Sequence, residues 1–147
     1  MTILRKALIA GLVAGVLIQF VPVSRTNPPV ESEIHAPEKV EGVLSRSCYN
    51  CHSNKTVWPW YSYVAPVSWL VSNDVSGARH KVNFTAWNRY TQDEQVTILR
   101  EIWKEVQGGD MPPWYYLIKH SEGRLSEDDK VVLRDWTQAP VPSGQGK

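Results

Sequence analysis

One short run of residues constrains this chain more than any other feature of its sequence. Cys48 and Cys51 are the only cysteines among 147 residues, and they stand in the run Cys48-Tyr49-Asn50-Cys51-His52. A Cys-x-x-Cys-His run is the attachment signature of c-type haem: two thiols join the two vinyl groups, and the histidine binds the iron. The sequence therefore predicts one covalently attached haem c, held by Cys48 and Cys51, with His52 as the proximal iron ligand.

Two other uses of a cysteine pair agree less well with the sequence. A structural zinc site usually takes four ligands from two separate pairs, and this chain has no second cysteine pair. A thioredoxin-like redox dithiol belongs to a βαβ setting, and nothing before Cys48 has the pattern of a strand. Haem attachment is therefore the preferred interpretation.

The N-terminal segment differs from the rest of the chain. Arg5 and Lys6 precede an apolar run from Ala7 to Val23 that is interrupted by Gln19. At ~1.5 Å per residue this run spans ~26 Å, close to the ~30 Å hydrocarbon core of a bilayer. The residues after it contain no good small-x-small cleavage site, which favours a membrane anchor over a cleaved signal segment. The preceding basic residues indicate a cytoplasmic N-terminus and a periplasmic domain, on the side where bacteria attach c-type haem.

Composition divides the chain into four segments. Residues 1–23 form the anchor or signal segment, 24–36 an extended linker, 37–138 the haem-binding domain, and 139–147 a flexible tail rich in Pro, Gly and Ser. The net charge is +1 with both signs mixed along the chain, which gives no support for a nucleic-acid partner. The expected partners are the cytoplasmic membrane and a redox protein that the sequence does not identify.

Apolar positions with a helical repeat recur four times after the linker. Thr91 and Glu94 have the spacing of a capping box. No segment has the alternating pattern of a strand, so the sequence predicts an all-α domain behind an N-terminal transmembrane helix. The helices are expected from Pro37 into the haem motif, from Pro66 to near Gly77, between Thr91 and Gly108, and between Ser126 and Pro140. In the second of them, Val67, Leu70, Val71 and Val75 fall on one side.

The second axial position of the iron decides which chemistry is open to the protein. Met111 is the one methionine beyond the start of the anchor, and it lies in a loop with two glycines before it and two prolines after it. We predict that Met111 is the distal ligand. His80 and His120 are the alternatives, as ligands, surface residues or partners of a haem propionate. His35 in the linker is the least favoured, and an empty position is also open.

Aromatic residues are numerous, with seven Trp and six Tyr. Most are expected in the core. Trp58, Trp60 and Tyr61 follow the haem motif closely enough to contact the ring, and large flat side chains suit the wall of a flat apolar cofactor. We therefore predict these three as further haem-binding residues.

The order of these motifs resembles the class I cytochromes c and, more closely, the bacterial family of small haem-binding domains. The resemblance covers about Pro37 to Trp136. It implies a membrane-anchored N-terminus and a single haem. Thr85 stands where the family would have Ser. The matching residues are Cys48 to Asn54, Trp58 to Tyr61, Asn83-Phe84-Thr85, and Met111-Pro112 with Tyr116.

The expected function is one-electron transfer at the periplasmic face of the cytoplasmic membrane. An iron bound by His52 and Met111 has no open site for a substrate, so the protein is not expected to be an enzyme. The alternative is a peroxidase-like haem enzyme or a diatomic-gas sensor with an open distal site, in which His80 or His120 would act over the iron. A structural or maturation role for the haem is a third possibility.

Overall fold

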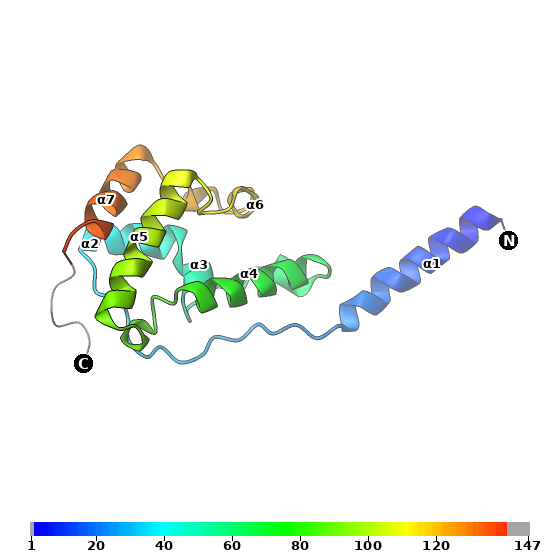
Figure 1. Cartoon of the computed structure of the whole chain (residues 1–147). Coiled ribbons are helices and arrows are strands. Elements are labelled where there is room, and N and C mark those ends of the chain that lie inside the picture. Colours follow the sequence, from blue (N-terminus) through cyan, green and yellow to red (C-terminus); the bar gives the residue numbers. More distant parts are fainter. Residues whose placement is uncertain (1, 141–147) are drawn as a thin grey trace.

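The computed structural model describes residues 2–140, and in these residues the chain is helical between loops (Figure 1). The prediction of an all-α fold is confirmed, since the described part contains no strand and only one isolated bridge, between Ser32 and Ala86. The α-helices are α1 (Ile3–Leu17), α2 (Glu38–Ser47), α3 (Tyr49–His52), α4 (Val67–Lys81), α5 (Gln92–Gly108), α6 (Trp114–Leu117) and α7 (Glu127–Thr137). Short 3-10 helices are η1 (Ile18–Phe20), η2 (Trp60–Tyr63), η3 (Trp87–Arg89) and η4 (Ser121–Gly123).

The core lies where α7 packs on α2 and on α5. Leu44 of α2 and Leu133 of α7 are fully buried, and Leu99 of α5 and Phe84 join the same cluster. Burying one such side chain contributes about 1.5–3 kcal/mol. The apolar residues that repeat at helical spacing in the sequence therefore form a buried face on each of these three helices.

Capping motifs fix where the helices of this core begin and end. Thr91 and Glu94 form the predicted capping box, and Ser126 forms a second one with Asp129. Gly109 ends α5 with φ at 80°, in the left-handed region that favours glycine. The loop toward Met111 leaves the helix at this point.

The second predicted helix differs from the structure in length. Helix α4 continues past Gly77 to Lys81, because a single glycine costs a helix interior only about 1 kcal/mol. The side of α4 that carries its apolar residues is largely open. Of the apolar residues expected there, only Val75 is buried, and Val67 and Leu70 are exposed.

Residues 21–36 run in an extended conformation along the domain (Figure 1). Ile34 is buried in the core, and its amide donates to the carbonyl of Phe84 at 2.8 Å. Arg79 of α4 holds the earlier part through hydrogen bonds to the carbonyl of Thr26 at 2.7 Å and to Oδ1 of Asn27 at 2.8 Å. We call residues 24–30 the strap.

Helix α1 projects away from the domain, and none of its residues is buried. Within the described residues, one helix is long and apolar enough to cross a membrane, the stretch Ile3–Phe20, with a mean hydropathy of 1.8.

Candidate functional site

A cavity of about 790 Å³ opens beside the haem motif, between α3, α4, η2 and the loop that joins α5 to α6. Cys48, Cys51 and His52 line one part of it, and Met111 lines another. Most of the remaining lining is apolar, including the exposed face of α4 with Val67 and Leu70. Its volume lies within the range of about 300–1,000 Å³ that is typical of cofactor sites.

The backbone presents His52 to this cavity in a defined orientation. Nδ1 of His52 lies 3.2 Å from the carbonyl oxygen of Val82 and can only donate to it, so Nε2 is left without a proton. Burial lowers the pKa of His52, which keeps the ring neutral. A neutral imidazole with a free Nε2 is the form that binds iron.

The two cysteines are free: Cys48 is the residue between α2 and α3, and Cys51 lies within α3. Burial raises the pKa of Cys48 to about 12 and that of Cys51 to about 11, so both are thiols at neutral pH. A reactive dithiol needs a thiolate at neutral pH, whereas a zinc site needs further ligands close by. In the described part of the chain, no three His, Cys, Asp or Glu side chains are grouped to hold a metal ion. The donors therefore suit haem better than either alternative.

Met111 reaches the cavity through the turn that ends α5. The left-handed Gly109 reverses the chain, and the amides of Asp110 and Met111 then donate to the carbonyl of Glu105 at 3.0 and 3.3 Å. The side chain of Met111 is 37% exposed and lines the cavity. This turn brings a thioether into the cavity that holds the imidazole.

The three predicted aromatic residues are placed differently from one another. Trp60 and Tyr61 line the cavity. Trp58 does not line it, and its Nε1 is buried without a hydrogen-bond partner among the described residues.

The three other histidines differ in whether they line the cavity. His80 and His35 do not line the cavity, whereas His120 does. Both ring nitrogens of His120 are already engaged: Nε2 lies 2.6 Å from the hydroxyl of Tyr61, and Nδ1 lies 3.1 Å from the carboxylate of Glu122. Its ring also stacks on Tyr116, with ring centroids 4.4 Å apart.

A buried polar network behind His52 was not predicted as part of the site. Oδ1 of Asn83 accepts from the amide and the hydroxyl of Thr85, and its Nδ2 donates to Asn54 at 2.8 Å. The amide of Phe84 donates to the carbonyl of His52 at 2.8 Å. The motif Asn83-Phe84-Thr85 thus fixes the backbone of His52, and its only signal in the sequence was the family resemblance.

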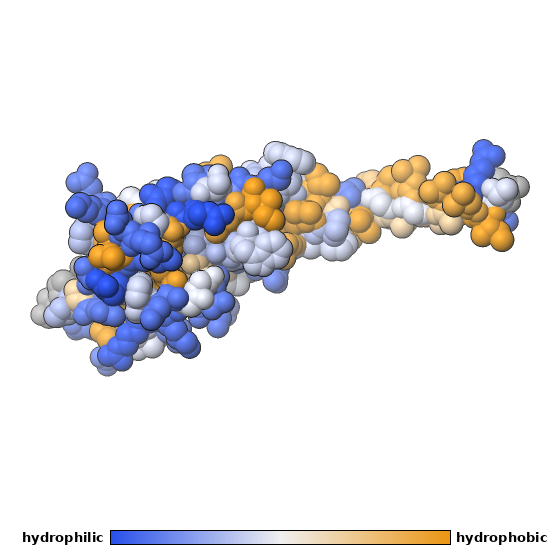
Figure 2. Space-filling view, turned by 90° about the horizontal axis from the view of Figure 1, so that it is seen from above, coloured by the Kyte–Doolittle hydropathy of each residue, from blue (hydrophilic) through white to orange (hydrophobic). Residues whose placement is uncertain are grey.

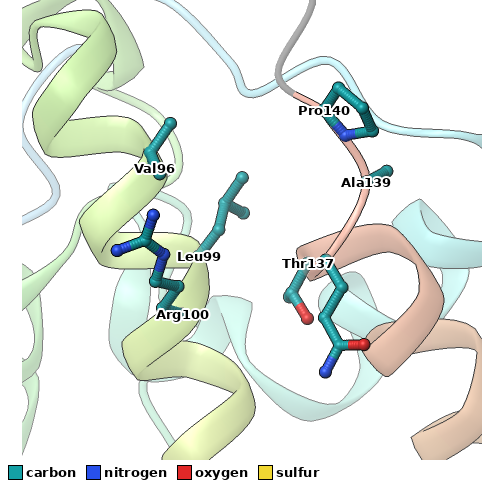
Figure 3. A pocket seen from close by; sticks show the side chains of 7 residues that line it. Val96, Leu99, Arg100, Thr137, Ala139 and Pro140 are labelled. Atoms are coloured by element: carbon teal, nitrogen blue, oxygen red, sulfur yellow. The ribbon is translucent and has the colours of Figure 1, made fainter.

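A second, smaller pocket of about 370 Å³ lies between α5 and the end of α7 (Figure 3). The described residues that line it include no cysteine, histidine or methionine. They are Val96, Leu99, Arg100, Thr137, Gln138, Ala139 and Pro140. This pocket has no donor for iron, so the cavity beside the haem motif is the candidate site.

Comparison with known proteins agrees with this choice. The model of the family described as "Haem-binding domain" matches residues 13–139. No curated protein and no solved structure matches the chain.

Proposed function

The chain belongs to the haem-binding domain family, and from this premise we propose that it is a membrane-anchored, single-haem c-type cytochrome that transfers one electron at a time. The observation that carries the proposal is the set of groups around one apolar cavity: two thiols, one imidazole and one thioether. The cofactor supplies reversible cycling of its iron between Fe(II) and Fe(III). The protein acts as an electron carrier, not as an enzyme, and its partner is a second redox protein.

We assign the attachment of the haem to Cys48 and Cys51. Each thiol would add its S–H across one vinyl group, sulfur to one carbon and hydrogen to the other, with no leaving group. His52 would hold the iron through Nε2, which its contact with Val82 leaves free. Lys81 and Lys119, which line the cavity together with Asp74, Glu101 and Glu105, would be the partners of the two propionates.

We assign the distal position to Met111. Among the alternatives only His120 lines the cavity, and binding iron would cost it a hydrogen bond to Tyr61 or Glu122. Met111 has no competing side-chain partner among the described residues. A thioether favours Fe(II) and raises the reduction potential, and the apolar wall around it excludes water.

Helix α1 supplies the proposed location. Its composition and length suit a single membrane span, and Arg5 and Lys6, in the first turn of α1 ahead of the apolar run that begins at Ala7, support a cytoplasmic N-terminus. The haem domain then lies on the periplasmic side. A soluble periplasmic form would arise if the segment were cleaved.

The substitution Met111→Ala tests the distal assignment. We expect loss of the weak far-red band of ferric His/Met haem, rapid binding of CO or cyanide, and a lower reduction potential. Absorption spectra with and without added ligand, together with redox titration, measure all three effects. Covalent attachment is measured separately by mass spectrometry and by resistance to acid-acetone extraction.

His120→Gln is the control for that test. It removes the imidazole but leaves Met111 in place, so the far-red band is expected to persist. If Met111→Ala leaves spectrum and potential unchanged while His120→Gln alters both, the distal ligand is His120.

A second candidate function rests on the hydrogen-bonded row at the cavity wall. In one consistent arrangement the hydroxyl of Tyr61 donates to Nε2 of His120, whose Nδ1–H donates to Glu122. Such a row can pass a proton, which a peroxidase-like enzyme requires and a simple electron carrier does not. A high-spin wild-type spectrum with fast CO binding would favour this candidate or a gas sensor over the cytochrome.

A further inference from the structure

The most exposed tryptophans of the described chain are both at one end of the domain. Trp60 and Trp114 have 75% and 74% of their surface exposed, and Trp69, at 38%, is next. Trp60 belongs to η2 and Trp114 to α6. Figure 1 shows α6 and the start of α4 on the side of the domain nearest α1, whereas α2, α5 and α7 lie on the opposite side.

Other exposed apolar side chains belong to the same two elements or follow them directly in the chain. Tyr63 of η2 and Ile118 after α6 are 59% and 66% exposed, and Val64 and Val67 are exposed beside η2. In Figure 2 hydrophobic surface extends from this end of the domain onto α1, and the opposite end is mostly hydrophilic. We call Trp60, Tyr63, Val64, Val67, Trp114 and Ile118 the aromatic rim.

Direct contacts hold the rim beside the end of α1. The side chain of Gln19, in η1, donates to the carbonyl of Ala65 at 3.2 Å and accepts from its amide at 2.9 Å. The guanidinium of Arg25 lies 4.5 Å from the ring centroid of Tyr63 and donates to the carbonyl of Ser62 at 3.2 Å. The part of the rim in and after η2 therefore lies next to η1, where the apolar helix ends, and Figure 1 shows α6 on the same side of the domain.

We propose that the aromatic rim lies in the headgroup layer of the bilayer that α1 crosses. This inference rests on the proposed membrane anchor. Trp and Tyr concentrate at membrane–water interfaces, where one part of the ring is apolar and another is wet. Arg25 places a cation at the same level, where lipid phosphates lie.

The rim also borders the haem-motif cavity. Trp60 and Val67 belong to both, since each lines the cavity and is exposed at the surface. A domain seated on its rim has this part of the cavity wall facing lipid, so a redox partner that is itself in the membrane has direct access to it.

Fluorine NMR on the full-length haem-loaded protein tests the inference. The protein carries fluorotryptophan and is placed in nanodiscs of phosphatidylethanolamine and phosphatidylglycerol. Single Trp→Phe substitutions at positions 60, 114, 103 and 136 assign the four signals that are compared. One probe is a lipid with a nitroxide at its headgroup, and the other is a water-soluble gadolinium chelate. At each signal, the line broadening caused by the nitroxide lipid is divided by the broadening caused by the gadolinium chelate. This ratio removes the effect of how exposed each side chain is.

We expect this ratio to be several-fold higher at Trp60 and Trp114 than at Trp103 of α5 and Trp136 of α7, which serve as controls. If the ratios are equal at all four positions in protein that stays in the discs, the aromatic rim does not lie in the headgroup layer, and the proposed membrane anchor is unaffected. Protein that does not enter the discs overturns the anchor and the inference together. Neither result depends on the iron ligands.

Discussion

Two helical glycines, Gly42 and Gly77, differ in whether they line the cavity, and Gly77 does. Both are helical glycines, in α2 and α4, and a Cβ added to either would meet no atom within 4 Å. The sequence suggested that Gly77 ends a helix, but the structure places it inside α4 on the cavity wall. A glycine there leaves room for a flat ring to approach the helix backbone.

We therefore expect different effects on stability and on haem loading from two alanine substitutions. Gly42→Ala should raise the free energy of unfolding of the haem-loaded protein by about 0.5–1 kcal/mol, through helix propensity alone. Gly77→Ala should gain no stability and should reduce haem loading, because its methyl group occupies space on the cavity wall. Denaturant titration and the haem-to-protein absorbance ratio measure these effects. An equal gain from both substitutions would contradict a haem lying against Gly77.

At the scale of elements, the cap of α7 also joins two helices. Asp129 accepts hydrogen bonds at 2.8 Å from the amide and hydroxyl of Ser126, and at 2.8 Å from Arg46 of α2. Burial alone would raise the pKa of Asp129, but these hydrogen bonds together lower it below the ordinary value of 3.8. The carboxylate is thus favoured in the folded state, and its contribution to stability is present above that value and lost as the pH falls below it.

This contact predicts an acid-dependent stability. Ser126→Ala should lower the free energy of unfolding by about 1 kcal/mol at neutral pH. Asp129→Asn should lower it at neutral pH and flatten its decline below about pH 4, where the carboxylate would otherwise take up its proton. Chemical denaturation at several pH values measures both. Glu94→Gln, in the matching cap of α5 with no partner from another helix, is the control and should change the acid dependence less.

These caps were predictable and the cavity wall was not, for a physical reason. Thr91 and Ser126 act on residues three positions away, so local sequence determines both caps. The apolar side of α4 has the same repeat as a buried face, and only tertiary structure shows that Leu70 faces a cavity and not a core. The placement of Met111 in that cavity depends on the turn at Gly109. The contact of His52 with Val82 joins residues 30 positions apart and has no sequence pattern.

At the scale of the whole molecule, Arg79 connects three parts of the chain. Its guanidinium donates to the carbonyl of Ser53 next to the haem motif, to the hydroxyl of Thr56, and to Thr26 and Asn27 of the strap, each at 2.7 or 2.8 Å. The segment after the apolar helix is therefore bound to the haem-motif loop, not free beside it.

Arg79→Lys should release the strap, because an ammonium group cannot reproduce the planar fork of donors. We expect faster hydrogen exchange in peptides that cover residues 24–36, where the amides of Glu31 and Ile34 are bonded to the domain. Mass spectrometry of exchanged peptides measures this. Arg134→Lys is the control, since among residues 2–140 the side chain of Arg134 pairs with the adjacent Asp135 alone. Unchanged hydrogen exchange in the Arg79→Lys variant would show that the other contacts of the strap hold it on the domain without Arg79.

The bound strap has a kinetic consequence for a chain anchored by α1. A domain on a free tether sweeps a volume above the membrane, whereas a domain clamped to its own anchor keeps one height and turns only with that anchor. It then meets a membrane-embedded electron donor by lateral diffusion in two dimensions. Its reduction rate should follow the number of donors per unit of membrane area, falling when lipid is added to proteoliposomes and staying constant when buffer is added.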